Sequence, residues 1–125
     1  MDPKEINDGK VLAILCYLIG IVGIVMLIVR NNAFALYHAK QWLILALTAI
    51  SVWVPIFIVS MVLGAITRGW GTCLIAPLSG LAGIGILALV VIGVINAANG
   101  VCKPLPVIGT FGEQWFKGIT KKPTP

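Results

Sequence analysis

The sequence has very little charge for its length. Of its 125 residues, nine are Lys or Arg and four are Asp or Glu, so charged types make up 10% while hydrophobic types make up 59%. A typical soluble domain carries about 25% charged residues, and a chain with far fewer has too little polar surface to remain in water. The composition therefore excludes an ordinary soluble enzyme domain. It predicts an integral membrane protein with a single membrane domain over residues 1–125.

The residue types that support catalysis and metal binding are also scarce. The single histidine excludes a site with two histidines, and the three cysteines are too widely spaced for a Cys-x-x-Cys motif. No Gly-rich phosphate-binding loop is present. The carboxylates all lie outside the long apolar runs, namely Asp2, Glu5, Asp8 and Glu113. We therefore expect no catalytic residue, no metal and no cofactor, and predict that the protein is not an enzyme.

Three long uncharged runs predict an all-α fold. Residues 11–29 and 41–67 hold 19 and 27 residues without a charge, and residues 69–102 hold 34. Because a helix needs about 20 apolar residues to cross a bilayer, we expect a polytopic transmembrane helical bundle of three spans. The spans are placed at about 11–29, at 41–67 with a kink at Pro55, and at 78–98. Four spans remain an alternative, with a break at the same proline.

The third run carries small residues at helical spacing. Gly85, Gly93 and Ala97 lie on one face and let another helix approach closely. We expect packing within the bundle there, with a homo-oligomer as the alternative. No charge lies inside a predicted span, which disfavours an ion pump or secondary transporter but leaves a passive pore open.

Lys and Arg predict the orientation. With three spans, six cationic residues share the side of the C-terminus and three share the side of the N-terminus. The positive-inside rule then places the C-terminus inside and the N-terminus outside. The net charge of +5 suits anionic lipid headgroups, and the absence of a basic stripe argues against nucleic acid.

Two polar clusters flank the predicted spans and are candidate sites. The first enters the second span, and the second ends the third span. We expect these residues to contact a partner protein or lipid: Phe34, His38, Lys40, Gln41, Asn96 and Asn99. For His38 two alternatives stay open, namely a hydrogen bond to a loop carbonyl that anchors the helix end, and a metal or pigment ligand. For Asn96 and Asn99 the alternative is that they cap the last carbonyls of the helix or pack against another helix.

The C-terminal region contains aromatic residues at helical spacing. Phe111, Trp115 and Phe116 share one face over residues 110–119, while Glu113 and Lys117 lie four residues apart on the other side. This pattern predicts a short amphipathic helix that lies in the membrane interface.

The polar motifs resemble a known family. Phe34-Ala35-Leu36-Tyr37-His38-Ala39-Lys40-Gln41 follows the first apolar run, and a late run ends in Ile95-Asn96-Ala97-Ala98-Asn99-Gly100 before Pro104-Leu105-Pro106-Val107-Ile108-Gly109. This order is similar to the small prokaryotic Tic-twenty-like membrane proteins, which include the magnetosome proteins MamF and MmsF and, distantly, a component of chloroplast protein import. The resemblance covers nearly the whole chain.

The resemblance implies a helical membrane protein that serves as a component of a larger membrane system, without catalysis. Together with the residues, it favours a non-enzymatic accessory or assembly subunit of a prokaryotic cytoplasmic membrane or a membrane derived from it. The expected partners are the lipid bilayer, other integral membrane proteins and further copies of the chain. The alternative is a component of a protein-conducting or small-solute pore.

Overall fold

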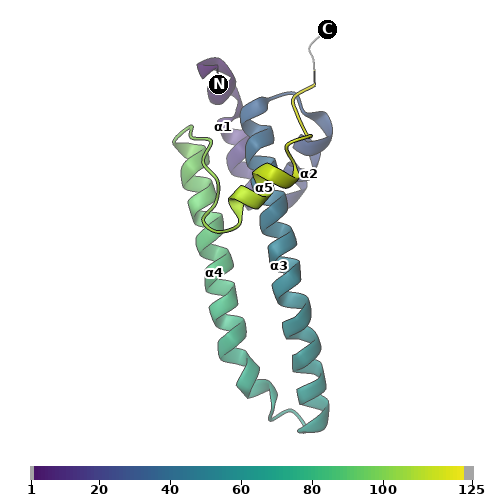
Figure 1. Cartoon of the computed structure of the whole chain (residues 1–125). Helices are drawn as coiled ribbons and strands as arrows, with labels where there is room; N and C mark the ends of the chain where they lie inside the picture. Colours follow the sequence, from purple (N-terminus) through teal and green to yellow (C-terminus); the bar gives the residue numbers. More distant parts are fainter. Residues whose placement is uncertain (1, 123–125) are drawn as a thin grey trace.

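The computed structural model describes residues 2–122, and all regular secondary structure in that range is helical. Five helices follow one another: α1 (Pro3–Leu18), α2 (Gly20–Val29), α3 (Ala33–Ile66), α4 (Thr72–Ala98) and α5 (Gly109–Trp115). The two long helices, α3 and α4, lie antiparallel side by side, and α1, α2 and α5 gather around the first part of α3 (Figure 1). We call the end of the molecule that carries these three helices the head.

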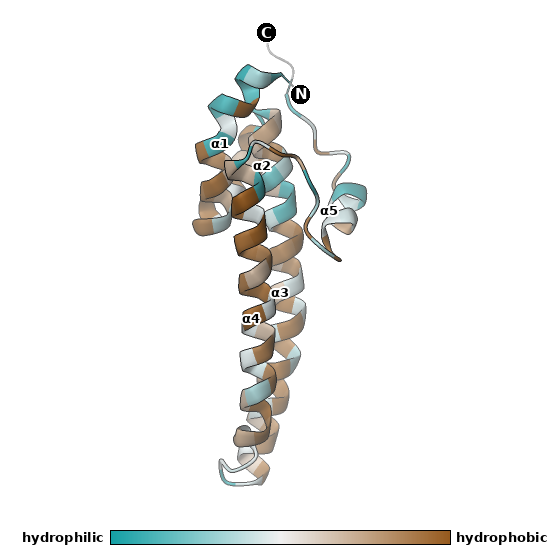
Figure 2. Ribbon diagram, turned by 90° about the vertical axis from the view of Figure 1, so that its left-hand side faces the viewer, coloured by the Kyte–Doolittle hydropathy of each residue, from teal (hydrophilic) through white to brown (hydrophobic). Residues whose placement is uncertain are grey.

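Helices α3 and α4 are the two membrane-spanning candidates. They hold 34 and 27 residues, or about 51 and 40 Å, and the bilayer core is about 30 Å thick. Most of the length of both helices consists of hydrophobic residues, apart from the first turns of α3 (Figure 2). The prediction of an all-α membrane protein is therefore confirmed, whereas a third span is not.

The first apolar run forms a helical hairpin instead of one straight span. The backbone of Ile19 is extended, with φ −125° and ψ 98°, and this residue separates α1 from α2. Helix α2 then returns toward the start of α1. Its ten residues measure about 15 Å, half the thickness of the bilayer core. Close packing favours the bend, because the ring of Trp42 lies directly against Gly20 and Gly23. A Cβ atom at either glycine would lie 2.8 Å or less from this ring.

The bounds of the other helices also differ from those predicted. Helix α3 begins at Ala33, because Asn32 caps it by accepting a hydrogen bond from the backbone N–H of Ala35 at 3.0 Å. It continues through Pro55 without interruption. Helix α4 begins six residues earlier than predicted and includes Pro77, and α5 ends four residues earlier than predicted.

Both ends of the described range, residues 2 and 122, lie in the head, opposite the α3–α4 turn that holds Arg68 (Figure 1). The backbone N–H of Lys122 donates to the carbonyl of Arg30 at 2.9 Å, and Lys121 pairs with Glu5 in the first turn of α1. The prediction that the N- and C-termini lie on opposite sides of the bundle is therefore wrong. It assumed that the first apolar run crosses the membrane, whereas the hairpin returns the chain to its starting level.

Candidate functional site

A row of polar side chains on the first turns of α3 binds the C-terminal segment, which we define as residues 101–122. Tyr37, His38, Lys40 and Gln41 each contact a different point along this segment, from Val101 to Ile119. These four residues are the polar row. The regular helix α3 spaces these side chains along one end of the helix, and the C-terminal segment runs alongside them.

Gln41 forms the central contact of the polar row. Its side chain is fully buried. Its amide nitrogen donates to the carbonyl of Gly109 at 3.0 Å, and its amide oxygen accepts from the backbone N–H of Leu105 at 3.0 Å. Both hydrogen-bonding ends of one amide are thus used. Gly109 suits this position, because a Cβ there would lie 2.6 Å from the Gln41 oxygen.

His38 is fully buried and links the hairpin to the C-terminal segment. Its Nε2 lies 3.0 Å from the carbonyl oxygen of Val101, and its Nδ1 lies 2.9 Å from the hydroxyl of Tyr17 on α1. A carbonyl only accepts, so Nε2 carries the proton of the neutral ring and Nδ1 accepts from Tyr17. The ring of Phe34 packs edge-on against the imidazole, with centroids 4.8 Å apart.

The remaining two members of the polar row bind farther along the C-terminal segment. The hydroxyl of Tyr37 donates to the carboxylate of Glu113 at 2.5 Å. The ammonium of Lys40 donates to the carbonyl of Ile119 at 3.2 Å. Every buried side-chain nitrogen or oxygen within residues 2–122 has a hydrogen-bond partner. All four members of the polar row therefore form hydrogen bonds within the chain.

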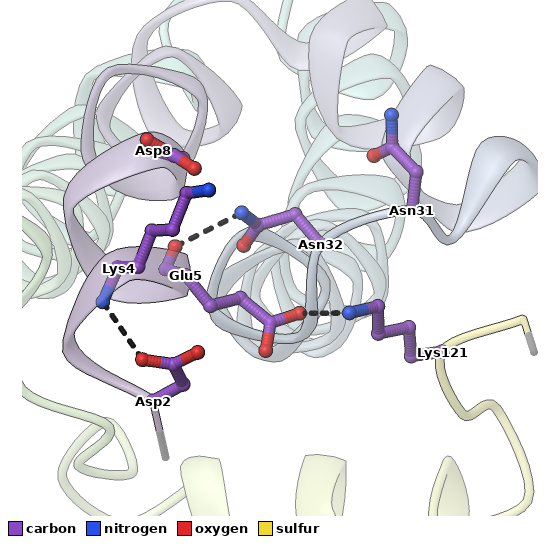
Figure 3. A pocket seen from close by; sticks show the side chains of 7 residues that line it. All are labelled: Asp2, Lys4, Glu5, Asp8, Asn31, Asn32 and Lys121. Atoms are coloured by element: carbon purple, nitrogen blue, oxygen red, sulfur yellow. Dashed lines mark hydrogen bonds and ion pairs between the residues drawn. The ribbon is translucent and has the colours of Figure 1, made fainter. Parts of the chain in front are cut away.

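A polar pocket lies where the two chain ends meet. Figure 3 shows Lys121 of the C-terminal segment reaching Glu5 of α1, while the Asn32 side chain bonds the Glu5 backbone. The Glu5 carboxylate pairs with Lys121 at 2.7 Å and accepts from the N–H of Ala33 at 2.8 Å. These contacts, led by that of Lys121, lower the pKa of Glu5 from its ordinary value of 4.5. The remaining lining residues are Asp2, Lys4, Asp8 and Asn31.

The predicted contact residues differ in how far they are buried. Phe34, His38 and Gln41 are fully buried and have no surface left for lipid or a partner, so their contacts are with the chain itself. For His38, the hydrogen bond to the carbonyl of Val101 matches the alternative in which the ring bonds a loop carbonyl. Asn96 donates to the carbonyl of Lys103 at 3.5 Å, and Asn99 is exposed at the end of α4. The two clusters thus both meet the C-terminal segment.

The predicted packing residues of α4 divide into two groups. Gly93 abuts the ring of Tyr17, and Ala97 is fully buried in the head. Gly85 faces open space, with no other atom within 4 Å of the position that a Cβ would take, so its predicted packing within the bundle is wrong. The head adds neighbours beside the C-terminal end of α4 alone, which is why the stripe is only partly used.

The predicted interfacial aromatic residues lie on and just after α5. Phe111 and Trp115 are 47% and 64% exposed, and Phe116 is half-buried. Phe111 and Trp115 border an apolar groove of about 270 Å³ against α3. The groove is completed by Ile44, Leu47, Thr48, Ser51 and Ile108. These positions are compatible with a helix lying at the membrane surface.

Sequence reasoning missed Tyr17, Tyr37 and Glu5. Each acts through a partner 21 to 116 residues away in the chain, and no local spacing links such pairs. Within residues 2–122, no group of three His, Cys, Asp or Glu side chains is arranged to hold a metal ion.

Comparisons with known proteins match most of the chain. The family described as "Magnetosome magnetite crystal formation protein family" (MamF_MmsF) matches residues 8–112. A curated relative, the UPF0132 membrane protein MJ1443 of Methanocaldococcus jannaschii, is 31% identical over 110 residues, covering 86% of this chain and 88% of its own length. No solved structure matches significantly.

Proposed function

The chain belongs to the magnetosome magnetite crystal formation protein family and is a membrane protein, and on that basis we propose that it is a non-enzymatic accessory or assembly subunit. In this role it packs against lipids and against other proteins of the same membrane. The single observation that carries the proposal is the polar row. Its side chains bind the protein's own C-terminal segment and build a rigid head on a largely apolar helix pair.

The outer faces of α3 and α4 supply the surface for such packing. Large apolar side chains are widely exposed along both helices, well away from the head. Examples are Phe57 at 64%, Met61 at 61%, Leu81 at 68% and Ile84 at 67%. In a bilayer such faces contact lipid tails or the helices of other proteins, and small residues among them allow close approach.

We also propose that the C-terminus lies inside, and that the N-terminus lies there with it. Arg68 occupies the turn opposite the head, and the other eight Lys and Arg residues belong to the head or its flanking segments. The positive-inside rule then places the head in the cytoplasm. An impermeant thiol reagent applied to intact cells should spare Cys102 in the head. Labelling of Cys102 from outside would reverse this orientation.

Native purification tests the accessory role. Full-length protein is extracted from its source membrane into native nanodiscs and analysed by native gel and mass spectrometry. The proposal expects one assembly with fixed stoichiometry and other membrane proteins in it. A lone chain or a pure homo-oligomer would contradict it, and conductance of that species in liposomes would favour the pore instead.

A pair of glycine variants locates the contact. Gly85 on α4 and Gly118 in the C-terminal segment both have free space around them in the chain. Gly85→Leu should weaken the assembly if a partner packs on that face of α4, because the larger side chain holds the helices apart. Gly118→Leu is the matched control and should leave the assembly intact.

A further inference from the structure

The cross-section of the protein differs strongly between its two ends. Within the head, α3 packs against α1, α2, α4 and α5, whereas toward the Arg68 turn only α4 runs beside it (Figures 1 and 2). The protein therefore tapers from five helices at one end to two at the other.

Contacts along α3 set the depth of the wide part. The tip of the hairpin lies at Gly20 against Trp42, nine residues or about 14 Å from the start of α3. Helix α5 packs at Ile44, where a Cβ on Gly112 would lie 2.8 Å from the Ile44 side chain, eleven residues or about 17 Å from the start of α3. Since α3 is about 51 Å long and a bilayer with its headgroups is about 40–45 Å thick, the added helices occupy the headgroup and outer acyl layers of a single leaflet.

The outer surface of the hairpin is apolar. Ile21, Ile24 and Ile28 are 67%, 49% and 66% exposed, and they lie on α2 at intervals of three and four residues. Phe111 and Trp115 present a second apolar surface from α5. Apolar side chains of this kind, inserted at the headgroup–acyl boundary, bind membranes in a curvature-sensitive way.

The charge of the head agrees with an anionic lipid surface. Eight cationic residues and all four carboxylates lie in the head and its flanking segments, which leaves this end net positive. Two of the carboxylates are already bound within the chain, by Lys121 and by Tyr37. The cationic excess therefore faces the headgroup layer directly above the exposed aliphatic side chains.

We propose that the α1–α2 hairpin and α5 form a wedge in the leaflet at the head end, and that this wedge concentrates the protein where that leaflet is convex. The partner surface is a strongly curved, anionic lipid leaflet. Convex bending spreads the headgroups and opens space for the added helices, whereas concave bending compresses them. The narrow end, with two helices, suits the opposing leaflet.

Single-vesicle fluorescence tests the proposal on the full chain. A dye on Cys102, in a Cys73→Ser background, labels the exposed cysteine of the head, while Cys16 is fully buried. The protein is reconstituted into vesicles of phosphatidylcholine and phosphatidylglycerol with diameters from about 200 to about 50 nm. An impermeant quencher then separates the two orientations, because it reaches only heads that point outward.

The two orientations must respond to curvature with opposite sign. Outward heads should rise in surface density by about twofold or more as the diameter falls, because they sit in the convex leaflet. Inward heads should fall in density over the same range. An identical dependence on diameter in both populations would overturn the wedge, since nothing about a non-specific preference for small vesicles depends on orientation.

Two variants test the hairpin itself. Replacing Ile21, Ile24 and Ile28 by Gln should flatten the response of the outward population, because the polar side chains withdraw α2 from the acyl layer. The same three positions replaced by Leu are the matched control and should keep the response. A full response in the Gln variant would overturn the role of the hairpin. If that variant loses helicity in circular dichroism, the orientation test of the unaltered hairpin decides.

Discussion

The polar row predicts a large effect from one substitution, Gln41→Met. Methionine matches the length of glutamine and is accepted in apolar interiors, but it provides neither of the two hydrogen bonds. The N–H of Leu105 and the carbonyl of Gly109 would lose their partners at a fully buried position. Each unsatisfied buried group costs about 1–3 kcal/mol, so the docking of the C-terminal segment should weaken by about 2–6 kcal/mol.

Hydrogen exchange at the Leu105 amide measures this loss directly. Because about 1.4 kcal/mol corresponds to a factor of ten, exchange at this amide should accelerate by about 30-fold or more in nanodiscs. Amides in the middle of α3 and α4 should keep their protection, which separates local release from global unfolding. Gln114→Met, at an exposed position on α5, is the matched control. A change of less than about threefold at Leu105 in the Gln41→Met protein would refute the assignment.

The contacts of the head give three further predictions. Tyr17→Phe removes the donor to Nδ1 of His38 and should lower the free energy of unfolding by about 1–3 kcal/mol, measured by urea titration in detergent micelles. Gly93→Ala places a methyl group against the ring of Tyr17 and should destabilise the protein by about 1–3 kcal/mol in the same assay. Gly85→Ala, in open space on the same helix, should instead stabilise it by up to about 1 kcal/mol, and equal effects of the two alanines would contradict the packing. Because the pKa of Glu5 is lowered in the folded protein, the stabilisation that the Glu5–Lys121 pair gives to the docked C-terminal segment is complete above pH 4.5 and is lost as the pH falls through the folded-state pKa. Acid should therefore release the end of this segment and accelerate its hydrogen exchange, and Glu5→Gln should remove that pH dependence.

The sequence alone was sufficient for the membrane environment and the two long helices. Their charge-free runs exceed the thickness of a bilayer, and few other structures accommodate so much continuous apolar surface. The burial of the small residue Ala97 also followed from helical spacing. The start of α3 could have been placed correctly, because Asn32 is a preferred N-cap residue.

The hairpin and the polar row could not be derived in the same way. A run of 19 apolar residues fits a single span as well as two short helices, and only the packing of Trp42 against two glycines favours the bend. Gln41 was predicted to contact lipid or a partner, and for His38 a loop carbonyl was one of the alternatives, but no local pattern identifies the segment that covers them. Their partners are backbone atoms 63 to 68 residues later in the chain, and backbone atoms have no residue identity to recognise.

A cross-linking experiment on the two chain ends tests the central claim most directly. Cysteines replace Glu5 and Lys121, whose side chains meet at 2.7 Å, in a protein otherwise free of cysteine and held in its native membrane. A short bis-maleimide reagent should join the pair within the chain, while a cysteine at position 5 with the native Cys73, near the opposite turn, should stay unlinked. If positions 5 and 121 each react with a single maleimide but never cross-link, the two ends lie apart, and the account of a shared head is wrong.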